Sequence, residues 1–161
     1  MPTNTYTALA TITLTSTDSS IDFANIPNTY RDLVLVIRAR NTVDAQGIRA
    51  QFNGDTANNY SYVVMFGTGS GSGSSGAVAS QGYADFGVNR TTETSTIIQI
   101  MDYSATDKHK TMLVRSDNAS EITLAYANRW ASNTAISTMK VYPSVNSFAI
   151  GSTFSLYGIR S

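Results

Sequence analysis

The sequence predicts an all-β fold: a single antiparallel β-sandwich of the jelly-roll type, built from about 8–10 strands. Three observations predict it. Apolar and polar residues alternate with a period of two in many short segments, which is typical of strands that bury one face. Turn-forming residues separate these segments at short intervals. Ser and Thr together account for 41 residues, whereas Lys and Glu account for only three and two, a composition that favours strands over helices.

Two segments show the alternation most clearly. Within residues 7–15, one face collects the apolar side chains Ala8, Ala10, Ile12 and Leu14. Within residues 121–130, one face collects Ile122, Leu124, Tyr126 and Trp130, and the opposite face collects Thr123, Ala125, Ala127 and Arg129. We expect further strands at residues 20–24, 33–41, 47–52, 60–66, 95–103, 111–116, 136–142 and 153–160.

The segment that begins at Leu33 is apolar at five consecutive positions, through Ile37. Such a run indicates a strand that is buried on both faces, and we expect a central strand of the sandwich. A subunit interface is the alternative explanation. The following Arg38-Ala39-Arg40 indicates that the strand then emerges into solvent or into a polar contact.

Turn and loop signals divide the strands. Pro27 permits at most one short helical turn near residues 27–32. Asn53-Gly54 predicts a tight hairpin turn between two strands, because both residues tolerate a positive φ angle. The Gly- and Ser-rich stretch at about residues 67–76 predicts a flexible loop inside one domain that spans residues 1–161.

Charge and hydropathy limit the partners that the chain can have. Eleven basic and eleven acidic residues cancel, so the sequence predicts no electrostatic attraction to nucleic acid or to an anionic membrane. No apolar run approaches the roughly 20 residues of a membrane span. The N-terminal residues lack the basic and apolar regions of a secretory signal, so we expect synthesis and folding in a cytosol.

The residue types that carry most enzyme chemistry are scarce. The chain has no cysteine and one histidine, His109, which removes the familiar zinc and thiol sites. His109 and Asp107 are too close in sequence to form a Ser-His-Asp system. Gly71, Gly73 and Gly76 match a dinucleotide-binding spacing, but no helical pattern follows them. We therefore expect a non-enzymatic protein with no cofactor and no metal.

Two weaker chemical hypotheses remain open. Glu93, Glu121 and the scattered aspartates leave room for a carboxylate pair of the kind that glycoside hydrolysis requires. The oxygens of Asn53, Asp55 and Asn58 would suit a calcium ion. A turn explains those three residues equally well, because Asn, Asp and Gly are the common turn residues.

Two small groups of residues are candidates for binding. A sugar could stack on aromatic rings, for which the candidates are Trp130, Tyr126, Tyr60 and Tyr62. Trp130 and Tyr126 share the apolar face of their strand, so packing in the core is the favoured explanation for both. Small side chains would let a second layer approach closely, which makes the candidate oligomer face Thr123, Ala125 and Ala127.

Four stretches of the chain resemble a known family: Tyr6–Ala10, Ser19–Leu33, Phe52–Ser61 and Phe148–Ile159. Together they resemble small β-sandwich structural proteins of tailed phages, notably those of cyanobacteria, which include capsid decoration (cement) proteins and fibre domains. The resemblance runs through most of the chain. It consists of strand and turn patterns and carries no catalytic signature.

This resemblance implies a virion structural protein, made in the host cytoplasm and located on the outer capsid surface. As a decoration protein it would form homotrimers that clamp the major capsid protein, or another virion protein, against the pressure of packaged DNA. The alternative is a tail-fibre or receptor-binding domain that recognises a host surface glycan. The short chain lacks the long repetitive shaft of a fibre, which favours the decoration protein.

Overall fold

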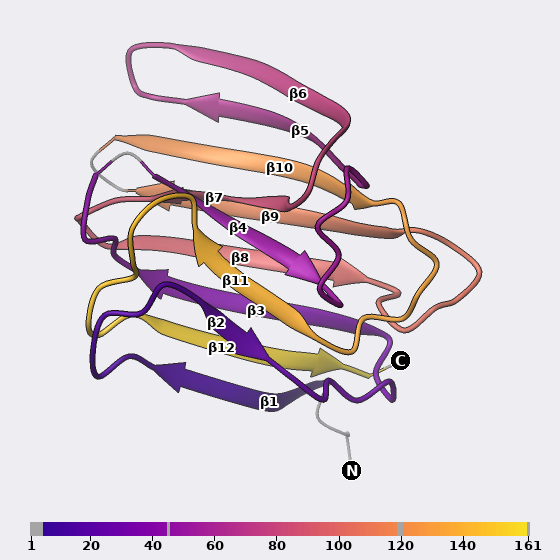
Figure 1. Cartoon of the computed structure of the whole chain (residues 1–161). Coiled ribbons are helices and arrows are strands. Elements are labelled where there is room, and N and C mark those ends of the chain that lie inside the picture. The colour runs from indigo at the N-terminus through magenta and orange to yellow at the C-terminus, as the bar shows by residue number, and fades with distance from the viewer. Residues whose placement is uncertain (1–4, 45, 119–120, 161) are drawn as a thin grey trace.

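The computed structural model describes residues 5–44, 46–118 and 121–160, which form twelve strands and no helix (Figure 1). The larger sheet has eight antiparallel strands in the order β1 (Tyr6–Thr13), β12 (Thr153–Ile159), β3 (Asp32–Ala39), β8 (Thr94–Met101), β9 (Lys110–Asn118), β10 (Ile122–Trp130), β5 (Tyr60–Gly67) and β6 (Ser72–Gln81). The smaller sheet has four, in the order β2 (Ile21–Phe23), β11 (Met139–Pro143), β4 (Gln46–Phe52) and β7 (Ala84–Asn89). The all-β sandwich that the sequence predicts is therefore confirmed, with more strands than expected. Among the described residues there is no helix that could cross a membrane.

The chain crosses repeatedly between the two sheets. β3 pairs with β12 and β8 in the larger sheet, and the next strand, β4, pairs with β11 and β7 in the smaller one. The partners are themselves consecutive in sequence: β11 precedes β12, and β7 precedes β8. Antiparallel ribbons therefore continue from one sheet into the other, which is the wrapping that defines a jelly roll.

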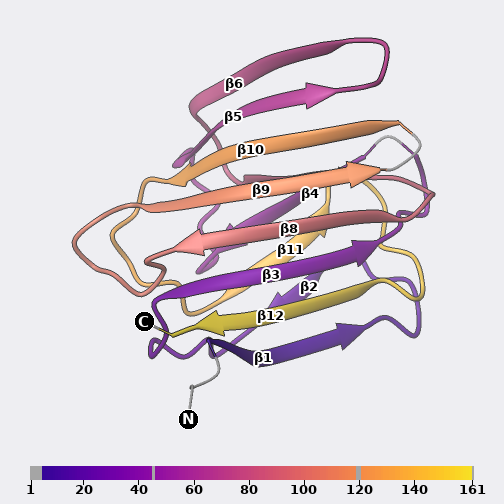
Figure 2. The same cartoon turned by 180° about the vertical axis from the view of Figure 1, so that it is seen from behind.

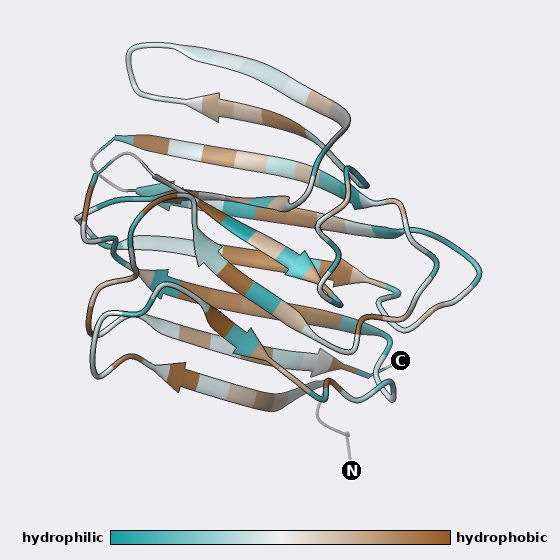
Figure 3. Cartoon of the chain, viewed as in Figure 1, coloured by the Kyte–Doolittle hydropathy of each residue, from teal (hydrophilic) through white to brown (hydrophobic). Residues whose placement is uncertain are grey.

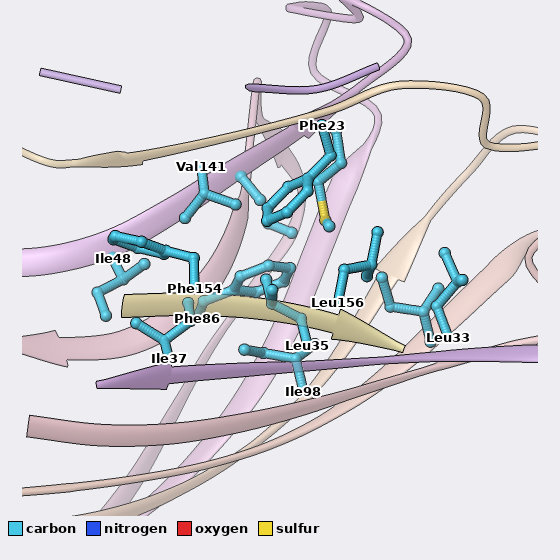
Figure 4. Packing of buried hydrophobic residues seen from close by; sticks show 14 of the residues in the cluster. Phe23, Leu33, Leu35, Ile37, Ile48, Phe86, Ile98, Val141, Phe154 and Leu156 are labelled. Atoms are coloured by element: carbon cyan, nitrogen blue, oxygen red, sulfur yellow. The ribbon is translucent and has the colours of Figure 1, made fainter. Parts of the chain in front are cut away.

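The core fills the space between the sheets, as Figure 4 shows. Strand alternation places one apolar set on the inner face of each sheet. The larger sheet contributes Leu33, Leu35, Ile37, Ile98, Phe154 and Leu156, and the smaller sheet contributes Phe23, Ile48, Phe86 and Val141. Each of these side chains stabilises the fold by roughly 1.5–3 kcal/mol relative to full exposure. β3 lies inside the larger sheet between β12 and β8, which confirms the central strand expected from its apolar run.

The two sheets differ in extent. β7 packs against β9 and β10, so the smaller sheet covers the middle of the larger one. The β5–β6 hairpin projects beyond this cover, at the top of Figures 1 and 2. Figure 3, in which the ribbon is coloured by hydropathy, shows the same contrast in composition: β6 is pale along most of its length, whereas the central strands carry strongly apolar residues. In the described part of the chain, no second layer therefore covers β6, the free edge of this hairpin.

The Gly- and Ser-rich stretch corrects the sequence-based expectation of a loop at 67–76. Only Thr68–Gly71 turn, closed by the Thr68 N–H donating to the Gly71 carbonyl at 2.8 Å, and β6 starts at Ser72. Gly73 gives one reason why β6 contains glycine. A Cβ there would lie 2.9 Å from the Phe66 ring, so the aromatic side chain on β5 uses the space that a glycine leaves.

The Asn-Gly turn has the expected backbone but not the expected role. Asn53 and Gly54 have φ angles of 52° and 70°, and the Asp55 N–H donates to the Phe52 carbonyl at 2.9 Å. The strands on either side, β4 and β5, belong to different sheets. The hairpin prediction is therefore wrong, because the turn passes the chain between layers.

Residues 27–32 contain bends and no helical turn, which agrees with the expectation of at most one. The Pro27 carbonyl accepts a hydrogen bond from the Tyr103 hydroxyl. One local expectation does change. In β1, the pairing register shifts between Ala8 and Ala10. This bulge leaves Ala8 exposed and brings Leu9 against the core, so one member of the predicted apolar face differs.

Candidate interaction surface

The outer face of the eight-stranded sheet has no described segment in front of it (Figure 2). Apolar side chains nevertheless lie on this face, on β9 and β5, the two neighbours of β10. Leu113 of β9 is 49% exposed, and Val63 and Met65 of β5 are 58% and 62% exposed. Scattered exposed apolar residues are ordinary, but a contiguous group of them marks an interaction surface.

The strand register brings these residues together around β10. Ala127 pairs with Leu113 on one side and with Val63 on the other. Ala125, two residues earlier on the same face of β10, pairs with Arg115 and Met65. Two alanines therefore form a floor between two ridges of larger side chains. We call this group, Val63, Met65, Leu113, Arg115, Ala125 and Ala127, the outer ridge-and-floor surface.

The predicted oligomer face belongs to this surface. Thr123, Ala125 and Ala127 are all exposed and share one face of β10, as the alternation predicted. Thr123 lies at the margin, where it pairs with Asp117 and Gly67. The flanking Val63, Met65 and Leu113 were not singled out from the sequence. The alternation within their own strands gave their face, but only the pairing register shows that they meet around β10.

Two shallow hollows lie on either side of Leu113. One, of about 320 Å³, extends over β9, β10 and β5 and includes Val63, Thr111 and Ala127. The other, of about 410 Å³, extends over β3, β8 and β9 and includes Val36, Ile97 and Leu113. The surface thus has relief as well as apolar character, which a closely packed protein partner can match.

Charges lie mostly at the rim of this face. Arg115 is the charged residue of the central rows. Toward one end of the strands, Arg38 forms an ion pair with Glu93. Toward the other end, the Arg129 guanidinium lies 2.8 Å from Nδ1 of the exposed His109. An apolar centre with a polar rim is the arrangement found in protein–protein interfaces.

The aromatic candidates for sugar stacking divide into two pairs. Trp130 and Tyr60 are 2% and 1% exposed, and their rings stack on each other with centroids 6.2 Å apart. Core packing, the favoured explanation for Trp130, is what the structure shows. Tyr62 and Tyr126 are half-buried on the inner face of the larger sheet and meet edge to face at 5.6 Å.

The residues considered for calcium serve the turn after β4. Trp130 Nε1 donates to Asp55 Oδ2 at 2.7 Å, and the Asn59 amide donates to the same oxygen at 3.0 Å. Burial raises the pKa of Asp55, but the hydrogen bonds from Asn59, Trp130 and Ala57 outweigh burial and hold this pKa below its ordinary value. Within the described ranges, no group of three or more acidic or histidine side chains is placed to hold a metal ion.

A second polar cluster lies where β7 meets β10. Burial raises the pKa of Asp85 to about 6, although the Gly87 N–H and the Arg49 guanidinium partly oppose this rise. Burial and the nearby Asp85 also raise the pKa of Tyr126. The Asp85 backbone is held by the Asn128 side chain, whose Oδ1 accepts from its N–H at 3.0 Å and whose amide donates to its carbonyl at 2.9 Å. The cluster therefore fastens the edge of the smaller sheet to the larger one.

A further hollow, of about 420 Å³, opens between β1 and the segment around β2. Its lining is mainly apolar and includes Leu9, Ile12, Phe23, Ile26, Pro27 and Tyr30. Asp22 is the acidic side chain in this lining. The hollow marks the margin of the core where the two sheets part.

Comparison with known proteins adds little beyond the sandwich. No protein-family model matches the chain, and no curated protein matches it. Among solved structures it is similar to a double mutant of the alginate lyase Aly36B in complex with alginate tetrasaccharide, with 11% identity over 93% of this chain and 80% of that one, and a TM-score of 0.29. It is also similar to a protein of unknown function, SO2946 from Shewanella oneidensis MR-1, with 12% identity over 98% and 77% of the two chains and a TM-score of 0.23. Likenesses at these TM-scores carry no argument about activity.

Proposed function

We propose that this chain is a non-enzymatic structural protein of a tailed-phage particle, most simply a decoration protein on the outer capsid surface. The observation that carries the protein-binding part of the proposal is the outer ridge-and-floor surface, an uncovered apolar face with a polar rim. The virion part of the proposal is supported by the sequence resemblance alone. The proposed partners are the major capsid protein, or another virion protein, and further copies of this chain in a homotrimer.

Burial of this surface would supply the binding free energy. Val63, Met65 and Leu113 are each about half exposed or more, and full burial of such a side chain contributes up to roughly 1.5–3 kcal/mol. The floor formed by Ala125 and Ala127 would let the partner approach the sheet closely. A shell binds many copies at once, so a modest affinity per copy suffices to reinforce it.

A pair of matched substitutions tests the proposed surface. Val63 on the outer face and Val145 in the β11–β12 connection are 58% and 54% exposed, so Val63→Glu and Val145→Glu make the same chemical change in two places. We expect Val63→Glu to weaken binding to capsids that lack the protein by tenfold or more, because a carboxylate would be desolvated in the contact. Val145→Glu should bind like the wild type in the same co-sedimentation assay. Equal binding by the two variants, or no binding by the wild type, would overturn the proposal.

The alternative proposal is a tail-fibre or receptor-binding domain that recognises a host glycan. The half-buried pair Tyr62 and Tyr126 is the observation in its favour, since Trp130 and Tyr60 are enclosed. Cryo-microscopy of the native virion separates the two. Density for this chain at the tail tip, with a bare capsid surface, would favour the fibre. Loss of glycan-array binding in a folded Tyr126→Ala variant would identify the sugar site.

A further inference from the structure

We propose that β6 is a docking edge at which two copies of this chain pair strand to strand, antiparallel and about a twofold axis. The inference rests on the backbone of the β5–β6 hairpin and is independent of the proposed virion role. An edge strand presents unpaired N–H and C=O groups, and natural proteins normally obstruct them.

Three of the four sheet edges carry an obstruction. β2 is three residues long and carries the charged Asp22. β1 has a bulge between Ala8 and Ala10, which interrupts its hydrogen-bonding register. β7 has its outward groups bonded to side chains of the larger sheet.

The bonds on β7 are specific. Asn128 bonds both the N–H and the carbonyl of Asp85, and Ser116 Oγ accepts from the Val88 N–H at 3.2 Å. These contacts occupy the groups that another strand would need. β7 is therefore closed to strand addition.

From Ser72 to Ala77, β6 carries none of these obstructions, and the register shift of the β5–β6 pair lies beyond this stretch, between Tyr62–Ala77 and Tyr60–Gln81. From Gly67 to Tyr83 the sequence has neither a charged residue nor a proline. Every residue from Ser72 to Gly76 is exposed, and the register with β5 runs without a shift from Gly67–Ser72 to Tyr62–Ala77. Over this stretch the edge is therefore free of bulges, neutral and exposed.

The hairpin turn determines which backbone groups are free. The Thr68 N–H donates to the Gly71 carbonyl at 2.8 Å, so Thr68 and Gly71 form a hydrogen-bonded pair. Such pairs alternate along an antiparallel ladder. Gly73 and Ser75 therefore bond to β5, and Ser72, Ser74 and Gly76 direct their N–H and C=O groups outward. Among the described strands, none pairs with β6 on this side, because β6 is the last strand of its sheet.

A second copy fits this set of groups by symmetry. With a twofold axis at Ser74, its outward groups face those of Ser74 of the partner subunit. Ser72 then faces Gly76 of the partner subunit, and Gly76 faces the partner's Ser72. Every outward donor meets an acceptor, because antiparallel pairing is self-complementary about a twofold axis. A neutral edge also places no like charges opposite each other, which a charged edge would do.

The side chains of the edge are suited to close pairing. Ser72, Ser74 and Gly76 are small, and a Cβ at position 76 would lie 2.8 Å from the Tyr62 carbonyl oxygen, so this glycine is required by the hairpin itself. Pairing over one short strand buries little surface, and interfaces below about 1,200 Å² are weak and transient. We therefore expect a weak contact, in which the fraction of paired molecules depends on the protein concentration and rises where many copies are crowded on a surface.

The test is the mass of the full chain in a concentration series reaching roughly 1 mM, followed by sedimentation equilibrium. Ser74→Pro removes one outward N–H and no bond to β5, and proline is tolerated on edge strands. We expect the wild type to approach twice the mass of Ser74→Pro at the highest concentration, whatever other contacts the chain makes. Ser74→Thr keeps the N–H and should associate like the wild type. Circular dichroism and urea unfolding establish that each variant is folded.

A second variant keeps the proposal testable if Ser74→Pro does not fold. Ser74→Lys places two like charges at the axis, so association should weaken tenfold or more at low salt and recover at high salt. Equal masses for wild type and both variants would overturn the proposal, as would pairing of β6 with a strand of another protein while copies stay apart. Leu113→Glu changes another residue of the outer ridge-and-floor surface, on β9, which β10 and β5 separate from β6. It should weaken capsid binding and leave this association unchanged, so failure here and failure of the capsid-binding proposal give different results.

Discussion

β6 and β7 are consecutive strands, and each forms a free edge of a sheet, yet their outward backbone groups are in opposite situations. Those of β7 are bonded to Asn128 and Ser116, whereas those of β6 at Ser72, Ser74 and Gly76 face outward, where no described strand pairs with them. The difference follows from position. β7 lies over the larger sheet, whose inward side chains can reach it, but the β5–β6 hairpin projects past the smaller sheet. The edge strand β7 is therefore protected by side chains of the opposite sheet, and among the described strands β6 has no opposite sheet to protect it.

The largest effect on this comparison should come from Gly87→Ala. Gly87 has a φ angle of 106°, and a Cβ there would lie 2.3 Å from the Ser116 side chain, which bonds β7. We expect a loss of about 3 kcal/mol in the free energy of unfolding, measured by urea denaturation. Gly69→Ala is the control, because Gly69 also has a positive φ of 76° but has nothing within 4 Å of a new Cβ. Equal losses for the two variants would show that contact with the larger sheet does not matter.

A smaller loss should follow removal of the side chain that secures β7. Asn128→Ala leaves the Asp85 N–H and carbonyl without their partners, and we expect it to cost about 2 kcal/mol in urea denaturation. Amide exchange at Asp85 should accelerate in the same variant. Thr123→Ala, at an exposed position of the same strand, should change stability by less than about 0.5 kcal/mol. If the Asn128→Ala variant is as stable as the wild type, Asn128 does not protect the edge of β7.

The smallest effect should be a gain that depends on pH. Because the folded-state pKa of Asp85 is raised to about 6 from 3.8, its ionised form disfavours folding at neutral pH, and stability increases as the pH falls from 7 towards 4. We expect Asp85→Asn to stabilise the protein by roughly 1–2 kcal/mol at pH 7 and by almost nothing near pH 4. Asp107→Asn, on an exposed connection, is the control for the substitution itself. A gain that is equal at both pH values would contradict the cause assigned here.

β6 and β7 are also the two strands that the sequence did not predict. Each of the ten segments expected to form strands contains one, because apolar alternation survives in them as a local pattern. β6 lacked that pattern, since Gly73 leaves room for the Phe66 ring and Gly76 is required by the nearby Tyr62 backbone, and neither contact is a local preference. β7 lacked it because its bulge and Gly87 disturb the period of two. Both strands depend on partners distant in sequence.

The candidate surface was predictable to a similar extent. Alternation alone placed Thr123, Ala125 and Ala127 on an outward face, and they are exposed. The ridges beside them needed the pairing of β10 with β9 and β5, which no local pattern encodes. Asn53-Gly54 illustrates the same limit, because its φ angles followed from residue type but the sheet entered by the next strand did not.

The place of β12 has a consequence for how the chain folds. Residues 153–159 insert between β1 and β3, pairing Phe154 with Ile12 on one side and with Ile37 on the other. During synthesis, β1 therefore has no neighbour in its sheet until the ribosome has added almost all of the described chain. Sheets dominated by such distant pairings fold on the order of milliseconds to seconds, more slowly than helical bundles. In that interval the apolar inner faces of β1 and β3 are exposed to chaperones and to aggregation with other nascent chains.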